Sequence, residues 1–246
     1  MKEMLKVENL WLSVGDRQVL KGVNFSMNYG EVHMLFGPNG AGKTSFIMTL
    51  MGFPRYKIDE GKIYFKGVDI TNLDVYERAR LGLGISFQRP PTVRGVTLKK
   101  MVEILGNDRI KKEELSGIAE ALKLTGHMER GLNDGFSGGE MKRSELLQLI
   151  AQKPDLVLID EPESGVDLEN IALVGESINT LLGKVDRIKD PKRGAIIITH
   201  TGYILDYVNA DRGYIIIDGN LVCGGNPRDI LAEIKKHGYR RCAVCR

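Results

Sequence analysis

Residues 37–44 read GPNGAGKT, and this stretch constrains the fold of the chain more than any other. It matches the pattern G-x-x-x-x-G-K-[ST], follows the strand-like run GEVHMLFG (30–37) and opens the helix-like run KTSFIMTLM (43–51). A glycine loop between a strand and a helix presents backbone N–H groups and a helix N-terminus to phosphate. The stretch therefore predicts a P-loop in an α/β fold.

The P-loop predicts a site for a nucleoside triphosphate with Mg²⁺. Lys43 is expected to reach the β- and γ-phosphates, and the hydroxyl of Thr44 is expected to bind the metal ion. The flanking strand and helix argue against a chance match. We assign the whole loop to the nucleotide: Gly37, Pro38, Asn39, Gly40, Ala41, Gly42, Lys43 and Thr44.

Strand-like and helix-like runs alternate along most of the chain, which predicts an α/β protein. Apolar and polar residues alternate at 5–14 and 17–27, as in antiparallel strands. The later strand-like runs are 30–37, 61–70, 83–88, 155–160 and 195–200, with a hairpin at Asp218-Gly219. The helix-like runs are 43–51, 74–81, 97–124, 137–152, 168–184, 203–209 and 227–237. The stretch at about 89–136 interrupts the alternation and is expected to form a short helical subdomain.

Composition narrows the function classes. The net charge of +3 does not argue for a nucleic-acid partner. No apolar run approaches the roughly 20 residues that span a bilayer, so no direct insertion into a membrane is expected. The N-terminus lacks the apolar block of a signal peptide. We therefore expect a cytoplasmic protein, in which three cysteines do not form a disulfide framework.

Two consecutive acidic residues lie at the end of the apolar run DLVLID (155–160). Asp160 ends this run, which reads as a strand buried on both faces, and is predicted to hold Mg²⁺ together with Thr44. Glu161 comes next, and its carboxylate is predicted to polarise the attacking water. The alternative is a structural acid at a strand end.

Two further polar residues end predicted strands, Gln88 after LGISF and His200 after AIIIT. Ligands of open α/β sheets lie at the carboxyl ends of strands. Gln88 is therefore predicted to contact Mg²⁺ or the lytic water, and His200 to contact the γ-phosphate and orient that water. Each alone is more simply a surface polar residue, and the P-loop with Asp160 favours the functional interpretation. His33 is expected to be a strand residue, and His127 and His237 to be solvated.

A second glycine-rich helix start occurs at Ser137-Gly138-Gly139-Glu140. Ser and Glu three apart are the spacing of a capping box, which is the simplest explanation. Capping does not require two glycines, however, and they cost helix stability. They let a phosphate approach the backbone, so we predict that Ser137, Gly138 and Gly139 contact the far side of the γ-phosphate on another copy of the chain.

The P-loop, Gln88, SGGE (137–140), LIDEP (158–162), SGVD (164–167) and His200 occur in the order of the ATP-binding-cassette ATPases, and the chain resembles this family over essentially its whole length. The resemblance implies a P-loop NTPase (RecA-like) core with an N-terminal antiparallel β-subdomain and a helical subdomain. It implies ATP hydrolysis and a dimer that closes on ATP, with Asp167 crossing the interface beside the nucleotide.

Within that family the chain is most similar to SufC, the ATPase of Suf iron–sulfur cluster assembly. The similarity rests on GFSGGE, KRSELLQ, ESGVD, GEVHMLFGPNG and the ILDYV that follows His200. It implies a scaffold partner of the SufB or SufD type, reshaped by ATP-driven dimerisation. The alternatives are the ATP-binding subunit of a transporter with a membrane permease, and a non-catalytic regulatory cassette, against which the intact Lys43, Asp160, Glu161 and His200 argue.

Two departures from the family pattern concern adenine and partner binding. Val14 takes the place of an aromatic residue that stacks on adenine, and Trp11 lies three residues earlier. We therefore expect nucleotide affinity to depend mostly on phosphate contacts. Beyond Gln88, RPPTVRGVT (89–97) contains two prolines, which disfavour regular structure and suit an exposed docking loop. A plain connector is the alternative.

Lys142 lies one turn into the helix that begins at Ser137. An ion pair between Lys142 and Glu161 is hypothesised to hold the carboxylate away from the lytic water until a partner binds. The alternative is a solvated lysine.

The C-terminal tail at 242–246 follows a predicted cassette domain at 1–241. Its Cys242 and Cys245 have C-x-x-C spacing, which supplies two metal thiolates. Nearby arginines favour the thiolate. Two ligands are too few for a closed site, so free thiols or a redox-active pair are the favoured alternatives to a metal or cluster role.

Overall fold

The structure is a computed structural model that describes residues 2–107, 110–184 and 192–239. The strands are β1 (Glu3–Val14), β2 (Arg17–Asn28), β3 (Val32–Phe36), β4 (Lys57–Phe65), β5 (Val68–Asp69), β6 (Leu83–Ser86), β7 (Val93–Thr97), β8 (Gly131–Leu132), β9 (Leu156–Asp160), β10 (Gly194–Ile198), β11 (Arg212–Ile217) and β12 (Asn220–Gly225). The helices are α1 (Lys43–Met51), α2 (Val75–Leu81), α3 (Leu98–Gly106), α4 (Lys112–Ala121), α5 (Gly138–Gln152), α6 (Leu168–Leu181) and α7 (Pro227–His237), with 3₁₀ turns η1 (Thr125–His127) and η2 (Tyr203–Asp206).

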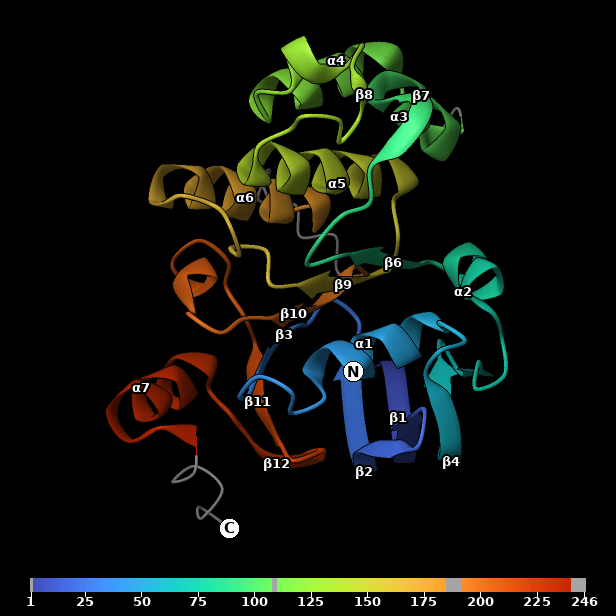
Figure 1. Ribbon diagram of the computed structural model, residues 1–246, viewed down its shortest axis with the longest axis vertical. Coiled ribbons are helices and arrows are strands. Elements are labelled where there is room, and N and C mark those ends of the chain that lie inside the picture. The colour runs from blue at the N-terminus through green and yellow to red at the C-terminus, as the bar shows by residue number, and fades with distance from the viewer. Residues whose placement is uncertain (1, 108–109, 185–191, 240–246) are drawn as a thin grey trace.

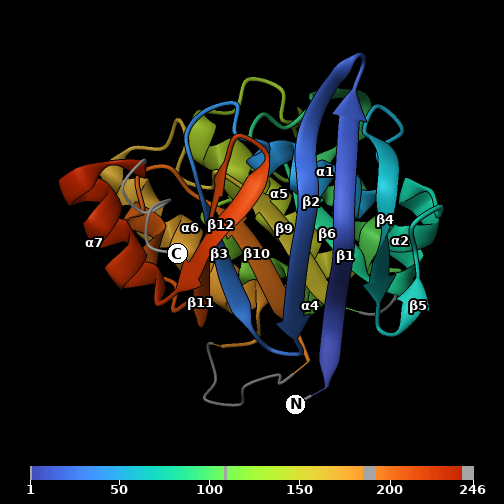
Figure 2. The same ribbon diagram turned by 90° about the horizontal axis from the view of Figure 1, so that it is seen from below.

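Two large sheets form the body of the molecule, in agreement with the predicted α/β class. The N-terminal sheet is antiparallel, in the order β2-β1-β4-β5. The central sheet has the order β12-β11-β3-β10-β9-β6 and is parallel apart from its edge strand β12. Figure 2 shows the antiparallel strands in front of the central sheet, with α1 between the two.

The central strands are apolar throughout because both of their faces are buried. In β9, Val157 and Ile159 face the core beneath α5 and α6, whereas Leu156 and Leu158 face the core shared with α1 and the N-terminal sheet. The register pairs Ile198 of β10 with both Leu35 of β3 and Asp160 of β9. These strands therefore end in one row, and the residues that follow them meet at one edge of the sheet.

The helical region lies at the opposite end of the molecule from the N-terminal sheet, with α3 and α4 beyond α5 (Figure 1). The expectation of an irregular docking loop at 89–97 was wrong for its second half. Residues 93–97 form β7, which pairs with β8. Residues 89–92, which include both prolines, lack regular structure, since proline restricts the residue before it and donates no backbone hydrogen bond.

No helix within the described ranges is long and apolar enough to span a bilayer.

The helix α1 follows the P-loop, and one buried arginine on α2 binds its C-terminal end. Arg78 is 2% exposed, and its guanidinium donates to the carbonyls of Thr49 and Leu50 in the last turn of α1. It also donates to the carbonyls of Thr71 and Leu73. Burial lowers the pKa of Arg78 to about 10, so it keeps its charge at neutral pH. The last-turn carbonyls of a helix need such donors, and Arg78 thereby fixes the end of the helix that carries the P-loop.

We predict that Arg78→Met lowers the free energy of unfolding by roughly 3 kcal/mol, because it leaves buried carbonyls without donors. Arg80→Met, at an exposed position of the same helix, serves as the control and is expected to cost far less. Urea unfolding followed by circular dichroism measures both. Equal losses for the two variants would show that the Arg78 contacts do not stabilise α1.

Candidate functional site

The P-loop has a backbone that its glycines permit. Gly42, just before α1, has φ +111°, and a Cβ there would lie 2.8 Å from Leu20 Cδ2. Gly37 has φ +151°, and a Cβ there would lie 2.2 Å from the carbonyl oxygen of Ile216. No side chain caps the N-terminus of α1, so its first N–H groups are available to an anion.

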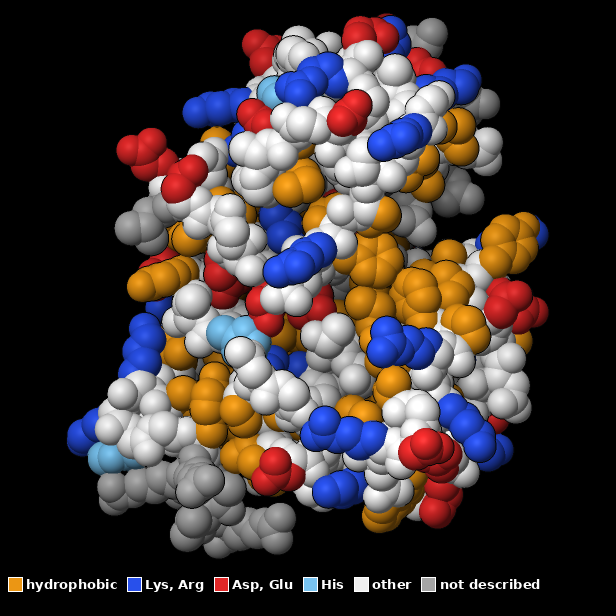
Figure 3. All heavy atoms as spheres, viewed as in Figure 1, with side chains coloured by type: hydrophobic (Ala, Val, Ile, Leu, Met, Phe, Trp, Pro, Cys, Tyr) orange, Lys and Arg blue, Asp and Glu red, His pale blue; other side chains and the backbone are white. Residues whose placement is uncertain are grey.

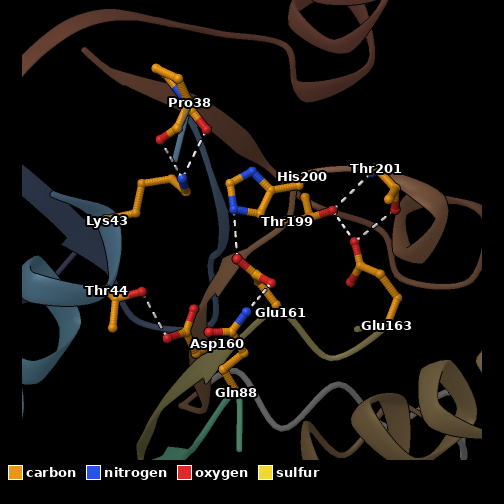
Figure 4. Close-up of polar contacts among 12 residues, drawn as sticks. Pro38, Lys43, Thr44, Gln88, Asp160, Glu161, Glu163, Thr199, His200 and Thr201 are labelled. Atoms are coloured by element: carbon orange, nitrogen blue, oxygen red, sulfur yellow. Dashed lines mark hydrogen bonds and ion pairs between the residues drawn. The ribbon is translucent and has the colours of Figure 1, made fainter. Parts of the chain in front are cut away.

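Lys43 lies under this loop and is 4% exposed. Its Nζ donates to the carbonyls of Gly37 at 2.8 Å and Pro38 at 3.0 Å (Figure 4). Burial lowers the pKa of Lys43 to about 8, while the nearby Glu161 and Asp160 act in the opposite direction. The chain thus holds a desolvated cation at the place where a triphosphate would bring negative charge.

Thr44 and Asp160 join the P-loop to the end of β9. Thr44 Oγ1 donates to Asp160 Oδ2 at 2.9 Å. Burial raises the pKa of Asp160, and the hydrogen bond from Thr44 lowers it in part. The second oxygen, Oδ1, is buried without a hydrogen-bond partner in the described structure. A hydroxyl beside an unpartnered carboxylate oxygen fits Mg²⁺, which prefers oxygen ligands.

Glu161 is the point where the predicted hydrolytic residues meet (Figure 4). Its Oε1 lies 2.6 Å from His200 Nε2, and its Oε2 accepts from Gln88 Nε2 at 2.6 Å. The backbone of Glu161 has φ +48°, a conformation that costs free energy in a non-glycine residue and clusters at functional sites. The ends of β6, β9 and β10 therefore place Gln88, Glu161 and His200 in one hydrogen-bonded group.

A hollow of about 850 Å³ opens over the P-loop and this group. Its lining is Pro38, Asn39, Gly40, Gly42, Lys43, Thr44, Ser45, Gln88, Glu161, His200 and Tyr239. Acidic, basic and histidine side chains gather around the middle of the face that carries it (Figure 3). The structure thus brings most of the predicted nucleotide residues together, whereas Gly37 and Ala41 belong to the loop without lining the hollow, and the carboxylate of Asp160 is fully buried beneath it.

The predicted second phosphate contact does not line this hollow. Ser137 and Glu140 form the capping box: the N–H of Ser137 donates to Glu140 Oε2 at 2.8 Å, and the N–H of Glu140 donates to Ser137 Oγ at 3.4 Å. The glycine at position 138 is explained by contacts within the chain, because a Cβ there would lie 2.2 Å from the carbonyl oxygen of Gly165. Gly139 is buried against Asn170. Ser137 itself is exposed, and a contact with ATP in a second copy stays a prediction.

Asp167 is the N-cap of α6 and is exposed. Its carboxylate accepts from the N–H of Asn170 at 2.9 Å and from the side-chain amide of the same residue. These hydrogen bonds lower the pKa of Asp167. Like Ser137, it lies outside the hollow over the P-loop of its own chain.

The hypothesised ion pair between Lys142 and Glu161 was wrong. Lys142 is 3% exposed, so it is not solvated either, and its Nζ donates to the carbonyls of Phe87 at 2.6 Å and Asp160 at 3.3 Å. One turn further along α5, Glu145 Oε1 accepts from the N–H of Phe87 at 3.0 Å. Two buried side chains of α5 thus hold both main-chain groups of the residue before Gln88.

Two aromatic residues of the site were missed by sequence reasoning. Tyr239, two residues beyond the end of α7, lines the hollow, and burial raises its pKa. No motif marks this position. Tyr56 lines a second hollow, of about 630 Å³, together with Val14. The two hollows share Gly40 and Ser45 of the P-loop region. A search for aromatics beyond α1, and not only on β1, would have found Tyr56.

The expectations for two histidines, Trp11 and the C-terminal cysteines had different outcomes. His33 is a buried residue of β3, as expected. His127, expected to be solvated, has its Nε2 3.2 Å from Glu140 Oε1 in the capping box. Trp11 does not line the second hollow; its indole N–H donates to Asn9 Oδ1 at 3.0 Å. Cys242 and Cys245 lie outside the described residues.

The chain is similar to ATP-binding cassettes of ABC transporters. A family model described as "ABC transporter" matches residues 20–164. A probable ABC transporter ATP-binding protein of Streptococcus pyogenes is 36% identical over 96% of this chain and 93% of its own length. A probable ATP-dependent transporter, ycf16, of Cyanidium caldarium is 35% identical, covering 98% of this chain and 97% of its own.

Solved structures give the same result. An ATP-binding cassette of an ABC transporter in its ADP conformation is 26% identical, with a TM-score of 0.74 over 100% of both chains. A nucleotide-free cassette from an ABC transporter is 28% identical, with a TM-score of 0.73 over 95% of both chains.

Stability is predicted to depend on pH through Glu145, whose pKa burial raises to about 7 against the hydrogen bonds from Phe87 and Ser86. The folded chain keeps this proton up to about pH 7, whereas the unfolded chain loses it near pH 4.5. The stabilisation is therefore complete below pH 4.5 and is lost as the pH rises to about 7.

Relative to Glu145→Gln, the wild type is expected to lose on the order of 3 kcal/mol of unfolding free energy across that interval. Urea unfolding of both proteins at several pH values measures the difference. Glu120→Gln, at an exposed position of α4, is the control, for which the difference stays flat. A flat difference for Glu145→Gln as well would contradict the prediction.

Proposed function

The chain belongs to the ABC transporter ATP-binding family, whose cassettes are ATPases, and from this premise we propose that it is the ATPase subunit of a Suf-type iron–sulfur cluster assembly scaffold. The observation that carries the catalytic part is the position of Glu161. Its carboxylate contacts Gln88 and His200 and faces the same hollow as the P-loop lysine. A base, two orienting groups and a phosphate cradle in one hollow suit hydrolysis of a nucleoside triphosphate.

In the proposed mechanism the triphosphate lies along the P-loop, with the N-terminal N–H groups of α1 and Lys43 against its β- and γ-phosphates. Glu161 accepts the proton of the attacking water. His200 holds Glu161 on one side and contacts the γ-phosphate, and Gln88 holds it on the other. Both contacts limit the directions in which the carboxylate turns, which favours a productive geometry.

Thr44, Asp160 and Gln88 are the proposed ligands of Mg²⁺, and the unpartnered Oδ1 of Asp160 supports this assignment. Gln88 gives its amide N–H to Glu161, which leaves the amide oxygen as its donor atom for an ion. When bound, the ion neutralises charge on the phosphates.

The base of the nucleotide is proposed to occupy the second hollow, beside Tyr56 and Val14. Tyr56 offers the aromatic surface that Val14 lacks, and Arg17, Lys21 and Arg55 add positive charge. This proposal revises the expectation that nucleotide affinity depends mostly on phosphate contacts.

Each site is proposed to be completed by a second copy of the chain. Ser137, Gly138, Gly139 and Asp167 do not line the hollow of their own chain, so a partner copy has to present them to the nucleotide. Ser137 and Asp167 are both exposed, which suits residues that act across an interface.

The scaffold partner is proposed to dock in a groove of about 750 Å³ between α2 and α3, in place of the docking loop that the sequence suggested at 89–97. Tyr76 and Ile104 line it and are 66% and 58% exposed, high values for large apolar side chains. Hydrophobic side chains also gather beside α2 in Figure 3. Apolar surface of this kind marks interaction sites. The assignment to a SufB- or SufD-like partner rests on the similarity of the signature and neighbouring motifs to SufC, and the cytoplasmic location stays a prediction.

A permease-coupled transporter subunit is the second candidate. The names of the relatives favour it, since they describe ABC transporter ATP-binding proteins and ATP-dependent transporters. The two candidates differ in their partner: a scaffold stays with the ATPase without detergent, whereas a permease needs detergent to remain in solution.

We predict that the tagged chain, purified from its native cells without detergent, retains a SufB- or SufD-like protein identified by mass spectrometry. Tyr76→Ser with Ile104→Ser is expected to reduce the recovered partner at least tenfold, since it removes apolar contacts at the centre of the groove. Val68→Ser, at a 47% exposed site outside the groove, is the control. Recovery of a permease instead, and only in detergent, would overturn the Suf assignment and leave the ATPase assignment standing.

A further inference from the structure

His200 lies between two threonines whose hydroxyls bind the same carboxylate (Figure 4). Thr201 Oγ1 donates to Glu163 Oε1 at 3.0 Å, and Thr199 Oγ1 donates to the same oxygen. Glu163 belongs to the segment after β9, two residues beyond Glu161. The turn that carries His200 is therefore attached on both sides to the segment that carries Glu161.

Both hydroxyls also fix the backbone of that turn. Thr199 Oγ1 accepts from the N–H of Gly202 at 2.8 Å, and Thr201 Oγ1 accepts from the N–H of Tyr203 at 3.3 Å. Each hydroxyl thus donates to Glu163 and accepts from the start of η2. A change in the position of the Glu163 carboxylate has to move the backbone on either side of His200.

The stability of the fold does not explain a glutamate at this position. Glu163 is 7% exposed, and its second oxygen, Oε2, is buried with no hydrogen-bond partner among the described residues. A buried carboxylate with an unpartnered oxygen costs free energy. Where a residue breaks such a rule, a functional role is the expected reason.

The turn that contains Glu163 also packs against the start of α5. The segment 161–167 is a compact turn, since Ser164 N–H donates to the Glu161 carbonyl at 3.0 Å and Val166 N–H donates to the Glu163 carbonyl at 3.2 Å. Gly138 of α5 leaves no room for a Cβ against the carbonyl of Gly165 in this turn. A shift of α5 therefore presses on the turn that holds Glu163.

We propose that Glu163 is a positioning residue that couples the start of α5 to His200, and through His200 to Glu161. The inference rests on the proposed role of His200 in ATP hydrolysis. When the helix start at Ser137 moves against Gly165, the Glu163 carboxylate carries that movement to Thr199 and Thr201. His200, which already contacts Glu161 in the single chain, is thereby set in the orientation from which it holds that carboxylate for attack.

The test is the steady-state ATPase rate of Glu163→Ala, Glu163→Gln and His200→Ala, and of Glu163→Ala combined with His200→Ala. Glu163→Ala is expected to lower kcat about tenfold to a hundredfold, the effect of a misplaced catalytic group, with nucleotide affinity unchanged. Glu163→Gln is expected to retain most of the rate, since its amide oxygen accepts from both threonines. Glu169→Ala, at an exposed position of α6, is the control and keeps the full rate.

In the His200→Ala background, adding Glu163→Ala is expected to have no further effect on kcat, because residues that act through one another are not additive. The thermal midpoint of Glu163→Ala is expected not to fall. Additive losses, or a fall in the midpoint and in nucleotide affinity that parallels the fall in rate, would overturn the inference. If His200→Ala alone kept the full rate, the proposed role of His200 would fail. A full rate in Glu163→Ala beside an impaired His200→Ala would overturn only the inference on Glu163.

Discussion

The parallel register of the central sheet is the constraint on which the site depends. Because β3, β10, β9 and β6 are neighbours and end in one row, four segments far apart in the sequence leave the sheet at one edge. They deliver Lys43, His200, Glu161 and Gln88 to one hollow. The strands are apolar and both faces of the sheet are buried, which stabilises the sheet. The buried sheet in turn keeps these four polar side chains close together.

The motifs that lie at the ends of strands were predictable from the sequence. The P-loop follows β3, the acid pair lies at the end of β9, and Gln88 and His200 come after β6 and β10. The rule that ligands lie at the carboxyl ends of strands places these residues together. A glycine pair by itself did not distinguish a phosphate contact from a packing requirement. At Gly138 the close approach of Gly165 explains the missing side chain without any phosphate.

Side-chain partners were not predictable, because they depend on directions that sequence spacing does not give. Lys142 lies near the start of α5 and Glu161 follows the next strand, which suggested an ion pair between them. In the structure Lys142 donates to main-chain carbonyls instead. Strand β7 was missed because its pairing with β8 joins residues more than 30 positions apart and prolines precede it. Tyr239 belongs to no motif, and the motif ESGVD that contains Glu163 does not say what this side chain contacts. Only the structure shows that Tyr239 lines the hollow and that Glu163 accepts from Thr201.

The central claim is that a hydrolytic site needs two copies of the chain, one supplying Lys43 and the other Ser137. Mixing Lys43→Ala with Ser137→Arg tests it most directly, because each variant alone has two defective sites and a mixed dimer has one intact site. The account predicts two inactive proteins whose equal mixture regains about a quarter of the wild-type ATPase rate, as half of the dimers are mixed. An inactive mixture of variants that still form mixed dimers, or full activity of Ser137→Arg alone, would contradict it.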